Sequence, residues 1–316
     1  MKYNSLGRTG IKVSELCFGA LPMGPLQGRM ILEQGAKLIR SALDNGVNFI
    51  DTAQMYKTYD YIALALKDYD GDVVISSKST AEDYRGMEQA VQEALTSLNR
   101  DCIDIFNLHA ARGTVDVFSE REGALRCILD YKQKGYIKAV AISTHSVLVT
   151  EKAAEIEEID VVFSIINKVG RGIREGTKEE MIKAINHCHQ AGKGVFAMKA
   201  LAGGNLADDL VASIKYVREI KGIDAVAIGM VNPRELELNL KIFNDEPIDE
   251  HLLLQAVQVK KLIILERFCT KCGACIEACP NNALLMGENS VKIDHEQCLL
   301  CGYCYPVCPE FIIRLV

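Results

Sequence analysis

Short apolar runs alternate with amphipathic stretches along the first 243 residues of the chain. The runs are rich in Val and Ile and occupy residues 15–19, 47–50, 73–76, 102–108, 139–142, 161–165, 195–197 and 225–228. Unbroken apolar runs of this length are typical of parallel strands that are covered on both faces. The stretches between them, such as 86–98 and 177–190, repeat apolar residues at helical spacing. The pattern therefore predicts eight strands that alternate with helices.

The spacing of the runs distinguishes two parallel architectures. Each strand and its helix take up roughly 29 residues, which is the size of one unit of a (β/α)8 TIM barrel. A doubly wound sheet is the alternative, but its usual G-x-G-x-x-G turn does not follow the first run. We therefore predict an α/β fold in which residues 1–243 form a barrel. Residues 244–266 are rich in Leu, Ile and Val, and we expect them to form a connecting helix.

Residues 267–316 hold most of the cysteines, in two runs with the spacing C-x2-C-x2-C-x3-C-P. This spacing holds cubane [4Fe–4S] clusters, and the fourth Cys of each run ligates the cluster of the other run. The first cluster is expected on Cys269, Cys272, Cys275 and Cys308, and the second on Cys298, Cys301, Cys304 and Cys279. Paired C-x2-C units also bind zinc, which is the alternative. The tail resembles a two-cluster bacterial ferredoxin, which implies electron transfer.

Composition narrows the possible partners and the compartment. The net charge is −6, so the chain lacks the general basic footprint of a nucleic-acid-binding protein. No apolar run approaches the length of a membrane span. Free thiols in this number fit a reducing compartment, and we expect a cytoplasmic protein.

Polar residues follow several of the predicted strands. Asp51, Lys78 and His109 each come at the end of an apolar run, and they are spaced by about one strand–helix unit. Active sites of (β/α)8 barrels lie at the carboxyl ends of the strands, so these side chains are expected to meet at one rim. Tyr56 lies in the loop D-T-A-Q-M-Y that begins with Asp51.

The same segments resemble the aldo-keto reductase family. The opening Y-N-S-L-G-R-T-G-I-K-V-S-E-L-C-F-G, the loop D-T-A-Q-M-Y, and the strands V-V-I-S-S-K and D-I-F-N-L-H carry the resemblance. It implies a catalytic tetrad of Asp51, Tyr56, Lys78 and His109 that acts on a small carbonyl or alcohol. Tyr56 would be the general acid, next to the Lys78 charge that Asp51 holds, and His109 would orient the carbonyl oxygen.

The resemblance also implies a bound NAD(P). Its expected contacts are Ser143, Asn167, Met198, Lys199, Gly203, Gly229 and Asn239. The chain departs from the family pattern at Thr144 and Phe163, where the family usually has Asn and Gln. Glu235 stands where a cation often binds the 2′-phosphate, and a carboxylate repels phosphate, so NAD is expected to be favoured over NADP.

Electron counting leaves a second function open. A nicotinamide exchanges two electrons as a hydride, whereas each cluster passes one, and a bound flavin can do both. The first hypothesis is a carbonyl oxidoreductase with iron–sulfur clusters. The alternative is an electron-transfer protein whose barrel binds a flavin or docks a partner, with an electron donor or acceptor protein outside. Under the first hypothesis, we expect the cluster domain to pack near the rim that bears Tyr56 and His109.

Overall fold

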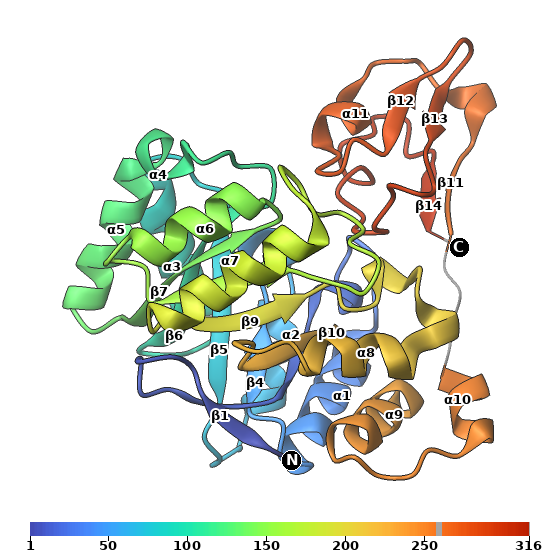
Figure 1. The fold of residues 1–316 in the computed structure, drawn as a ribbon. Helices are drawn as coiled ribbons and strands as arrows, with labels where there is room; N and C mark the ends of the chain where they lie inside the picture. Colours follow the sequence, from blue (N-terminus) through green and yellow to red (C-terminus); the bar gives the residue numbers. More distant parts are fainter. Residues whose placement is uncertain (257–260, 316) are drawn as a thin grey trace.

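A closed barrel of eight parallel strands forms the body of the computed structural model, which describes residues 1–256 and 261–315 (Figure 1). Around the barrel the strand order is β10-β3-β4-β5-β6-β7-β8-β9. The strands are β3 (Leu16–Gly19), β4 (Phe49–Asp51), β5 (Val74–Ser79), β6 (Ile103–Ala110), β7 (Ile137–Thr144), β8 (Val161–Ile165), β9 (Gly194–Met198) and β10 (Ala225–Gly229). Each predicted apolar run is therefore a strand, and the predicted barrel is confirmed.

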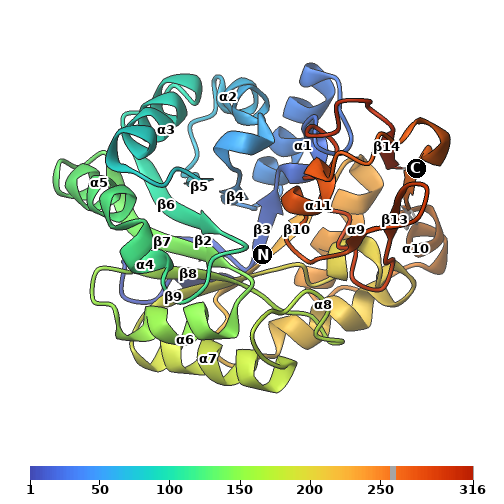
Figure 2. The same cartoon turned by 90° about the horizontal axis from the view of Figure 1, so that it is seen from above.

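Helices surround the barrel, as the view along its axis shows (Figure 2). They are α1 (Leu32–Asp44), α2 (Tyr59–Leu66), α3 (Tyr84–Ser97), α4 (Val117–Glu120), α5 (Glu122–Gln133), α6 (Val147–Glu155), α7 (Lys178–Gln190), α8 (Leu210–Arg218), α9 (Pro233–Phe243) and α10 (Glu250–Ala256). The 3-10 turns are η1 (Leu21–Met23), η2 (Gln54–Tyr56), η3 (Ala202–Gly204), η4 (Ala207–Asp209) and η5 (Glu266–Phe268). Local sequence fixes where several helices begin: Thr177 and Glu180 form a capping box at the start of α7.

A hairpin of two short strands, β1 (Tyr3–Ser5) and β2 (Lys12–Ser14), closes the amino-terminal end of the barrel. Leu6 in its turn and Val13 in β2 are fully buried among the inward-facing residues of the barrel, such as Phe196. The sequence pattern did not predict this hairpin. It leaves the opposite end, where the strands have their carboxyl termini, for the functional site.

The cluster domain stands on that opposite end of the barrel (Figure 1). It contains β11 (Leu262–Ile264), α11 (Ala274–Ala278), β12 (Leu284–Met286), β13 (Val291–Ile293) and β14 (Ile313–Leu315). Antiparallel pairing of β11 with β14 joins the two ends of the domain, and β12 pairs with β13. A small core of its own lies between them, and eight cysteines contribute to it or border it.

The predicted connecting helix over 244–266 is wrong in its extent. Helix α10 covers Glu250–Ala256 and packs against α9, with Leu252 and Ala256 in the barrel core. Residues 262–264 are a strand instead, because this Leu-Ile-Ile run pairs with β14 and Leu262 joins the core of the cluster domain. Residues 257–260 of the predicted helix lie outside the described residues. The domain limits at 243 and 267 stay a prediction.

Across the described ranges 1–256 and 261–315, we find no helix with the length and apolar character that crossing a membrane requires.

Candidate active site and cluster cavities

Three of the four predicted catalytic residues lie at the carboxyl ends of neighbouring strands. Asp51 is the last residue of β4, and Lys78 and His109 are next to last in β5 and β6. These strands are adjacent in the barrel, so their ends meet at one part of the rim. Tyr56 ends the η2 turn that follows β4. The structure therefore brings the four residues together: the spacing predicted this for Asp51, Lys78 and His109, and the family resemblance implied it for Tyr56.

Lys78 and Asp51 form a buried ion pair. The ammonium Nζ lies 2.7 Å from each carboxylate oxygen and donates to the Thr52 carbonyl, also at 2.7 Å. The two side chains are 1% and 7% exposed. Burial raises the pKa of Asp51 and lowers the pKa of Lys78, and the attraction between the two charges opposes both shifts. The carboxylate thus holds the ammonium in one position.

Tyr56 lies beside this ammonium. The Lys78 Nζ atom is 4.7 Å from the centre of the Tyr56 ring. Burial, followed by the nearby Tyr303 and Asp51, raises the pKa of Tyr56 well above its ordinary value. The phenol is therefore protonated at neutral pH, as a general acid must be.

His109 faces Tyr56 edge-on, with ring centres 6.0 Å apart. Burial, and then the positive charge of Lys78, keeps the pKa of His109 well below its ordinary value, so the imidazole is neutral. Its Nδ1 atom is buried and has no hydrogen-bond partner within the described parts of the chain. A neutral imidazole can donate one hydrogen bond from Nε2 toward the space that it shares with Tyr56.

Tyr303 of the cluster domain occupies that space. Its hydroxyl lies 3.1 Å from Nε2 of His109, and its side chain packs against Tyr56. Sequence patterns did not indicate this residue, although it stands between two predicted cluster ligands in C-G-Y-C. No local pattern shows a contact with a residue 194 positions earlier in the chain.

An open cleft of about 1160 Å³ runs from the tetrad along the carboxyl ends of β9 and β10. Asp51 and Tyr56 line its inner end. Five of the predicted nucleotide contacts also line it, namely Met198, Lys199, Gly203, Gly229 and Asn239. Neither Ser143 nor Asn167 is among its lining residues. The structure therefore gathers most of the predicted nucleotide contacts into one cleft.

Asn167 and Gly203 have structural partners that the sequence did not indicate. The Asn167 amide donates to the Arg171 carbonyl at 2.9 Å and accepts from the Arg171 N–H at 3.0 Å, so it holds its own loop. A Cβ atom on Gly203 would lie 2.0 Å from the carbonyl oxygen of Leu299. Gly203 thus gives room to the backbone of the cluster domain as well as bordering the cleft.

Polar groups at the start of α9 shape the far end of the cleft. Glu235 accepts hydrogen bonds from the Val231 N–H at 2.7 Å and from the Asn232 amide at 3.0 Å. Its carboxylate therefore already occupies the helix N-terminus, where a phosphate would otherwise bind. Asn239 lies one turn further on, and its Oδ1 atom is buried without a partner among the residues that the structure describes. A ligand with an N–H donor would satisfy this oxygen.

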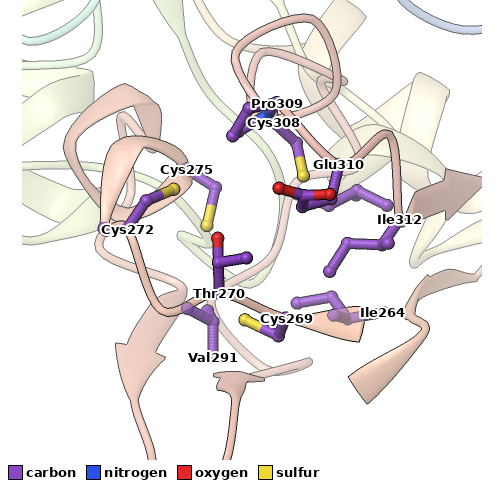
Figure 3. Close-up of a pocket in the computed structure, with 12 residues that line it drawn as sticks. Ile264, Cys269, Thr270, Cys272, Cys275, Val291, Cys308, Pro309, Glu310 and Ile312 are labelled. Carbon is purple, nitrogen blue, oxygen red and sulfur yellow. The ribbon is translucent and has the colours of Figure 1, made fainter. Parts of the chain in front are cut away.

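The eight motif cysteines surround two cavities. Cys269, Cys272, Cys275 and Cys308 line the first, of about 340 Å³, and their sulfur atoms point into a common space (Figure 3). Cys279, Cys298, Cys301 and Cys304 line the second, of about 310 Å³. These are the two crossed sets that the spacing predicted. In 1–256 and 261–315 no three His, Cys, Asp or Glu converge on a point for a single metal ion. The thiols instead enclose a volume, which suits a cluster of several atoms.

The second cavity faces the barrel. Leu299, beside the lining residue Cys298, is buried in the barrel core, and Arg112 donates to the Cys279 carbonyl at 2.8 Å. Tyr303, which contacts the tetrad, lies between Cys301 and Cys304. The expected packing of the cluster domain near the rim with Tyr56 and His109 is confirmed. We call the second cavity the inner cavity and the first the outer cavity.

Comparison with known proteins agrees with this geometry. The model of the aldo/keto reductase family matches residues 15–219. The chain belongs to the aldo/keto reductase family. A 4Fe-4S dicluster domain matches residues 268–312. This family member is therefore an enzyme, an oxidoreductase that carries a ferredoxin-like domain, and its fold implies a small-molecule carbonyl substrate.

Individual relatives are distant in sequence. L-galactose dehydrogenase of Arabidopsis thaliana is 25% identical over 225 residues, which cover 66% of this chain and 68% of the relative. The uncharacterized oxidoreductase YqkF of Bacillus subtilis is 21% identical over 295 residues, covering 79% and 94%. The structure of aldo-keto reductase AKR11C1 from Bacillus halodurans superimposes with a TM-score of 0.64 at 20% identity, covering 82% and 97%. That similarity shows the fold.

Proposed function

We propose that this aldo/keto reductase family member reduces a small carbonyl compound at Tyr56, with a nicotinamide nucleotide in the cleft and two [4Fe–4S] clusters in the cysteine cavities. One observation carries the proposal, namely the buried group of Asp51, Lys78, Tyr56 and His109 at the inner end of an open cleft. The reverse reaction, oxidation of an alcohol, uses the same groups.

Each of the four side chains has a defined task. Reduction of a carbonyl needs a proton on oxygen, and the protonated Tyr56 phenol supplies it. The Lys78 charge, 4.7 Å from the ring, stabilises the phenolate that remains. Asp51 holds that charge in place, and neutral His109 donates a hydrogen bond to the carbonyl oxygen.

The cleft fits a nicotinamide nucleotide, which would supply the hydride. Met198 and Lys199 would lie beside the nicotinamide, and Gly229 would allow close approach of the phosphates. Ser143 lies near the end of β7 outside the cleft lining, so its predicted contact with the nicotinamide amide would require the ligand to reach that strand end. Asn239 would receive an N–H donor on its unpartnered oxygen. The Asn167 side chain is held in its own loop by two hydrogen bonds with the Arg171 backbone, so it would contribute to nucleotide binding only from that fixed position. NAD is favoured over NADP, because the Glu235 carboxylate repels a 2′-phosphate.

The clusters would supply one-electron steps, and together they hold as many electrons as one hydride. Their ligands in this proposal are the crossed sets around the outer and inner cavities. The inner cavity lies close to the tetrad, because Tyr303 contacts His109 and stands between Cys301 and Cys304, which line that cavity. Cys272 of the outer cavity is exposed, which gives an external electron-transfer protein access to that cluster. We place the protein in the cytoplasm, because its thiols need a reducing compartment.

Steady-state kinetics of anaerobically prepared protein test the proposal. Tyr56→Phe is expected to lower kcat for NADH-dependent reduction of 4-nitrobenzaldehyde by a factor on the order of 100, because the general acid is lost. Tyr59→Phe is the matched control, since Tyr59 is equally buried but its hydroxyl bonds Ser77 at 2.7 Å, away from the cleft. Equal kcat in wild type and Tyr56→Phe contradicts the assignment. Release of a yellow chromophore on denaturation would identify a flavin in the cleft instead.

A further inference from the structure

The Tyr303 hydroxyl lies where the proposed mechanism needs the substrate. Tyr56 and His109 are the two groups that would hold a carbonyl oxygen during reduction. In the structure the Tyr303 oxygen lies 3.1 Å from Nε2 of His109, at hydrogen-bonding distance. The Tyr303 ring also packs with Tyr56 and Leu26, so the phenol fills the space beside the oxygen as well. Two oxygens cannot occupy this position at once.

The segment that carries Tyr303 is fitted to the barrel on both sides. Toward the loop after β3, Gly302 approaches Leu26 so closely that a Cβ atom would lie 2.0 Å from the Leu26 carbonyl oxygen. Gln27 in the same loop donates to the Leu300 carbonyl at 3.0 Å. These contacts belong to backbone and neighbouring side chains, so the position of Tyr303 does not depend on its own hydroxyl.

Toward the loop after β9, Asn205 donates to the Cys298 carbonyl at 2.9 Å. Gly203 leaves room for the Leu299 carbonyl. Residues 298–303 therefore bridge two loops of the barrel rim directly above the tetrad. This placement aims the Tyr303 side chain at Tyr56 and His109.

We propose that Tyr303 is a specificity-determining residue that occupies the carbonyl-oxygen position, so that a substrate must displace its phenol before Tyr56 can donate a proton. The proposal rests on the proposed function of the tetrad. It makes the cluster domain part of the substrate site. Carbonyl compounds compete with an internal ligand, and the apparent affinity of a substrate falls in proportion to the fraction of molecules in which Tyr303 has moved away.

An anchoring role for Tyr303 predicts different behaviour. If the side chain only fastened the cluster domain, its removal would loosen the domain and would leave the affinity for a carbonyl compound unchanged or weaker. If it competes with the substrate, its removal lowers Kd and KM together, while kcat changes little because Tyr56, Lys78 and His109 remain. The split between KM and kcat therefore separates the two roles.

The test compares anaerobic, cluster-loaded wild type with Tyr303→Ala and with Tyr305→Ala as control. Tyr305 lies in the same loop beside Cys304, but its ring stacks with Arg29, at 5.2 Å, instead of contacting the tetrad. Binding of 4-nitrobenzaldehyde is measured by calorimetry without nucleotide, and turnover is measured with NADH. Tyr303→Ala is expected to lower Kd and KM by about tenfold or more, which corresponds to displacement of an internal ligand present in most molecules. Tyr305→Ala is expected to match wild type.

Two results overturn the proposal: an unchanged or higher Kd in Tyr303→Ala, or an equal fall in Tyr305→Ala. If Tyr303→Ala loses its clusters, Tyr303→Phe decides, because it keeps the ring but loses the hydroxyl and its hydrogen bond with His109. It should lower Kd by roughly threefold or more, and an unchanged Kd overturns the proposal. Absence of NADH turnover in all variants would refute the proposed function. The Kd values would still show whether Tyr303 competes with the carbonyl compound.

Discussion

Replacing Asp51 by Asn would leave the Lys78 ammonium without its counter-ion inside the barrel rim. The Lys78 side chain is 1% exposed, and its ammonium contacts both oxygens of the Asp51 carboxylate. The substitution would turn this carboxylate into a neutral amide. Removing one partner of a buried ion pair costs about 3–5 kcal/mol. The Asn amide oxygen can still accept one hydrogen bond, so we expect the lower end, about 3 kcal/mol. For a domain of this size, the melting temperature should fall by about 6–12 °C.

A second substitution separates the cost of the stranded charge from the loss of the pair. Asp51→Asn with Lys78→Met removes both charges and retains a long apolar side chain, so most of the lost stability should return. Activity should not return, because no cation remains beside Tyr56. The matched control is Glu266→Gln, which breaks the ion pair between Glu266 and Lys292. The side chains of Glu266 and Lys292 are 54% and 52% exposed. Such an exposed pair contributes at most about 1 kcal/mol.

Thermal unfolding followed by far-ultraviolet circular dichroism, under anaerobic conditions and at one scan rate, measures these differences. The expected order of melting temperature is wild type and Glu266→Gln highest, then the double variant, then Asp51→Asn. A melting temperature of Asp51→Asn within about 2 °C of wild type would show that the pair is not the buried, coupled unit described above.

Three further predictions concern the clusters, the nucleotide and the domain contact. Iron and sulfide analysis should give about eight of each per chain, and Cys279→Ser should impair the inner cluster although Cys279 belongs to the first motif, which electron paramagnetic resonance can show. Glu235→Arg should improve NADPH binding relative to NADH by about tenfold in equilibrium titrations, and an unchanged ratio would exclude Glu235 as the discriminating group. Gly203→Ala would place a Cβ atom 2.0 Å from the Leu299 carbonyl oxygen and should expose residues 298–303 to hydrogen exchange. Gly204→Ala shares the positive φ, at 111° against 75°, but its Cβ would meet nothing closer than 3.9 Å, so it should expose that segment far less.

The barrel could be predicted because its signal is local. Most barrel strands are short, buried apolar runs rich in Val and Ile, as in V-V-F-S-I at 161–165, and their regular alternation with helical stretches identified them. The meeting of Asp51, Lys78 and His109 followed from the same pattern, because residues at the ends of neighbouring strands must meet at the rim. Tyr56 and the roles of the four residues came from the resemblance to the family. The cysteine sets followed from spacing, and the two cavities contain the residues that the crossing assigned.

The remaining features depend on contacts between distant segments. Tyr303 reaches His109 only because the cluster domain docks on the rim, and nothing near Tyr303 in sequence specifies that docking. Gly203 was predicted to contact the nucleotide, but the open space beside it is partly filled by the Leu299 carbonyl through a long-range contact. The strand at 262–264 read as helix because a short apolar run does not reveal its partner, which is β14 at the chain's end.

The fate of the hydride tests the central claim most directly, that the barrel reduces a carbonyl by hydride and proton transfer at Tyr56. Anaerobic protein is given 4-nitrobenzaldehyde and NADH with deuterium at both C4 positions, in ordinary water. The account predicts an alcohol that carries one deuterium on its carbinol carbon, since the hydride moves from the nucleotide to that carbon. An alcohol whose new C–H hydrogen comes from water would contradict it, because electrons and protons would then have arrived separately.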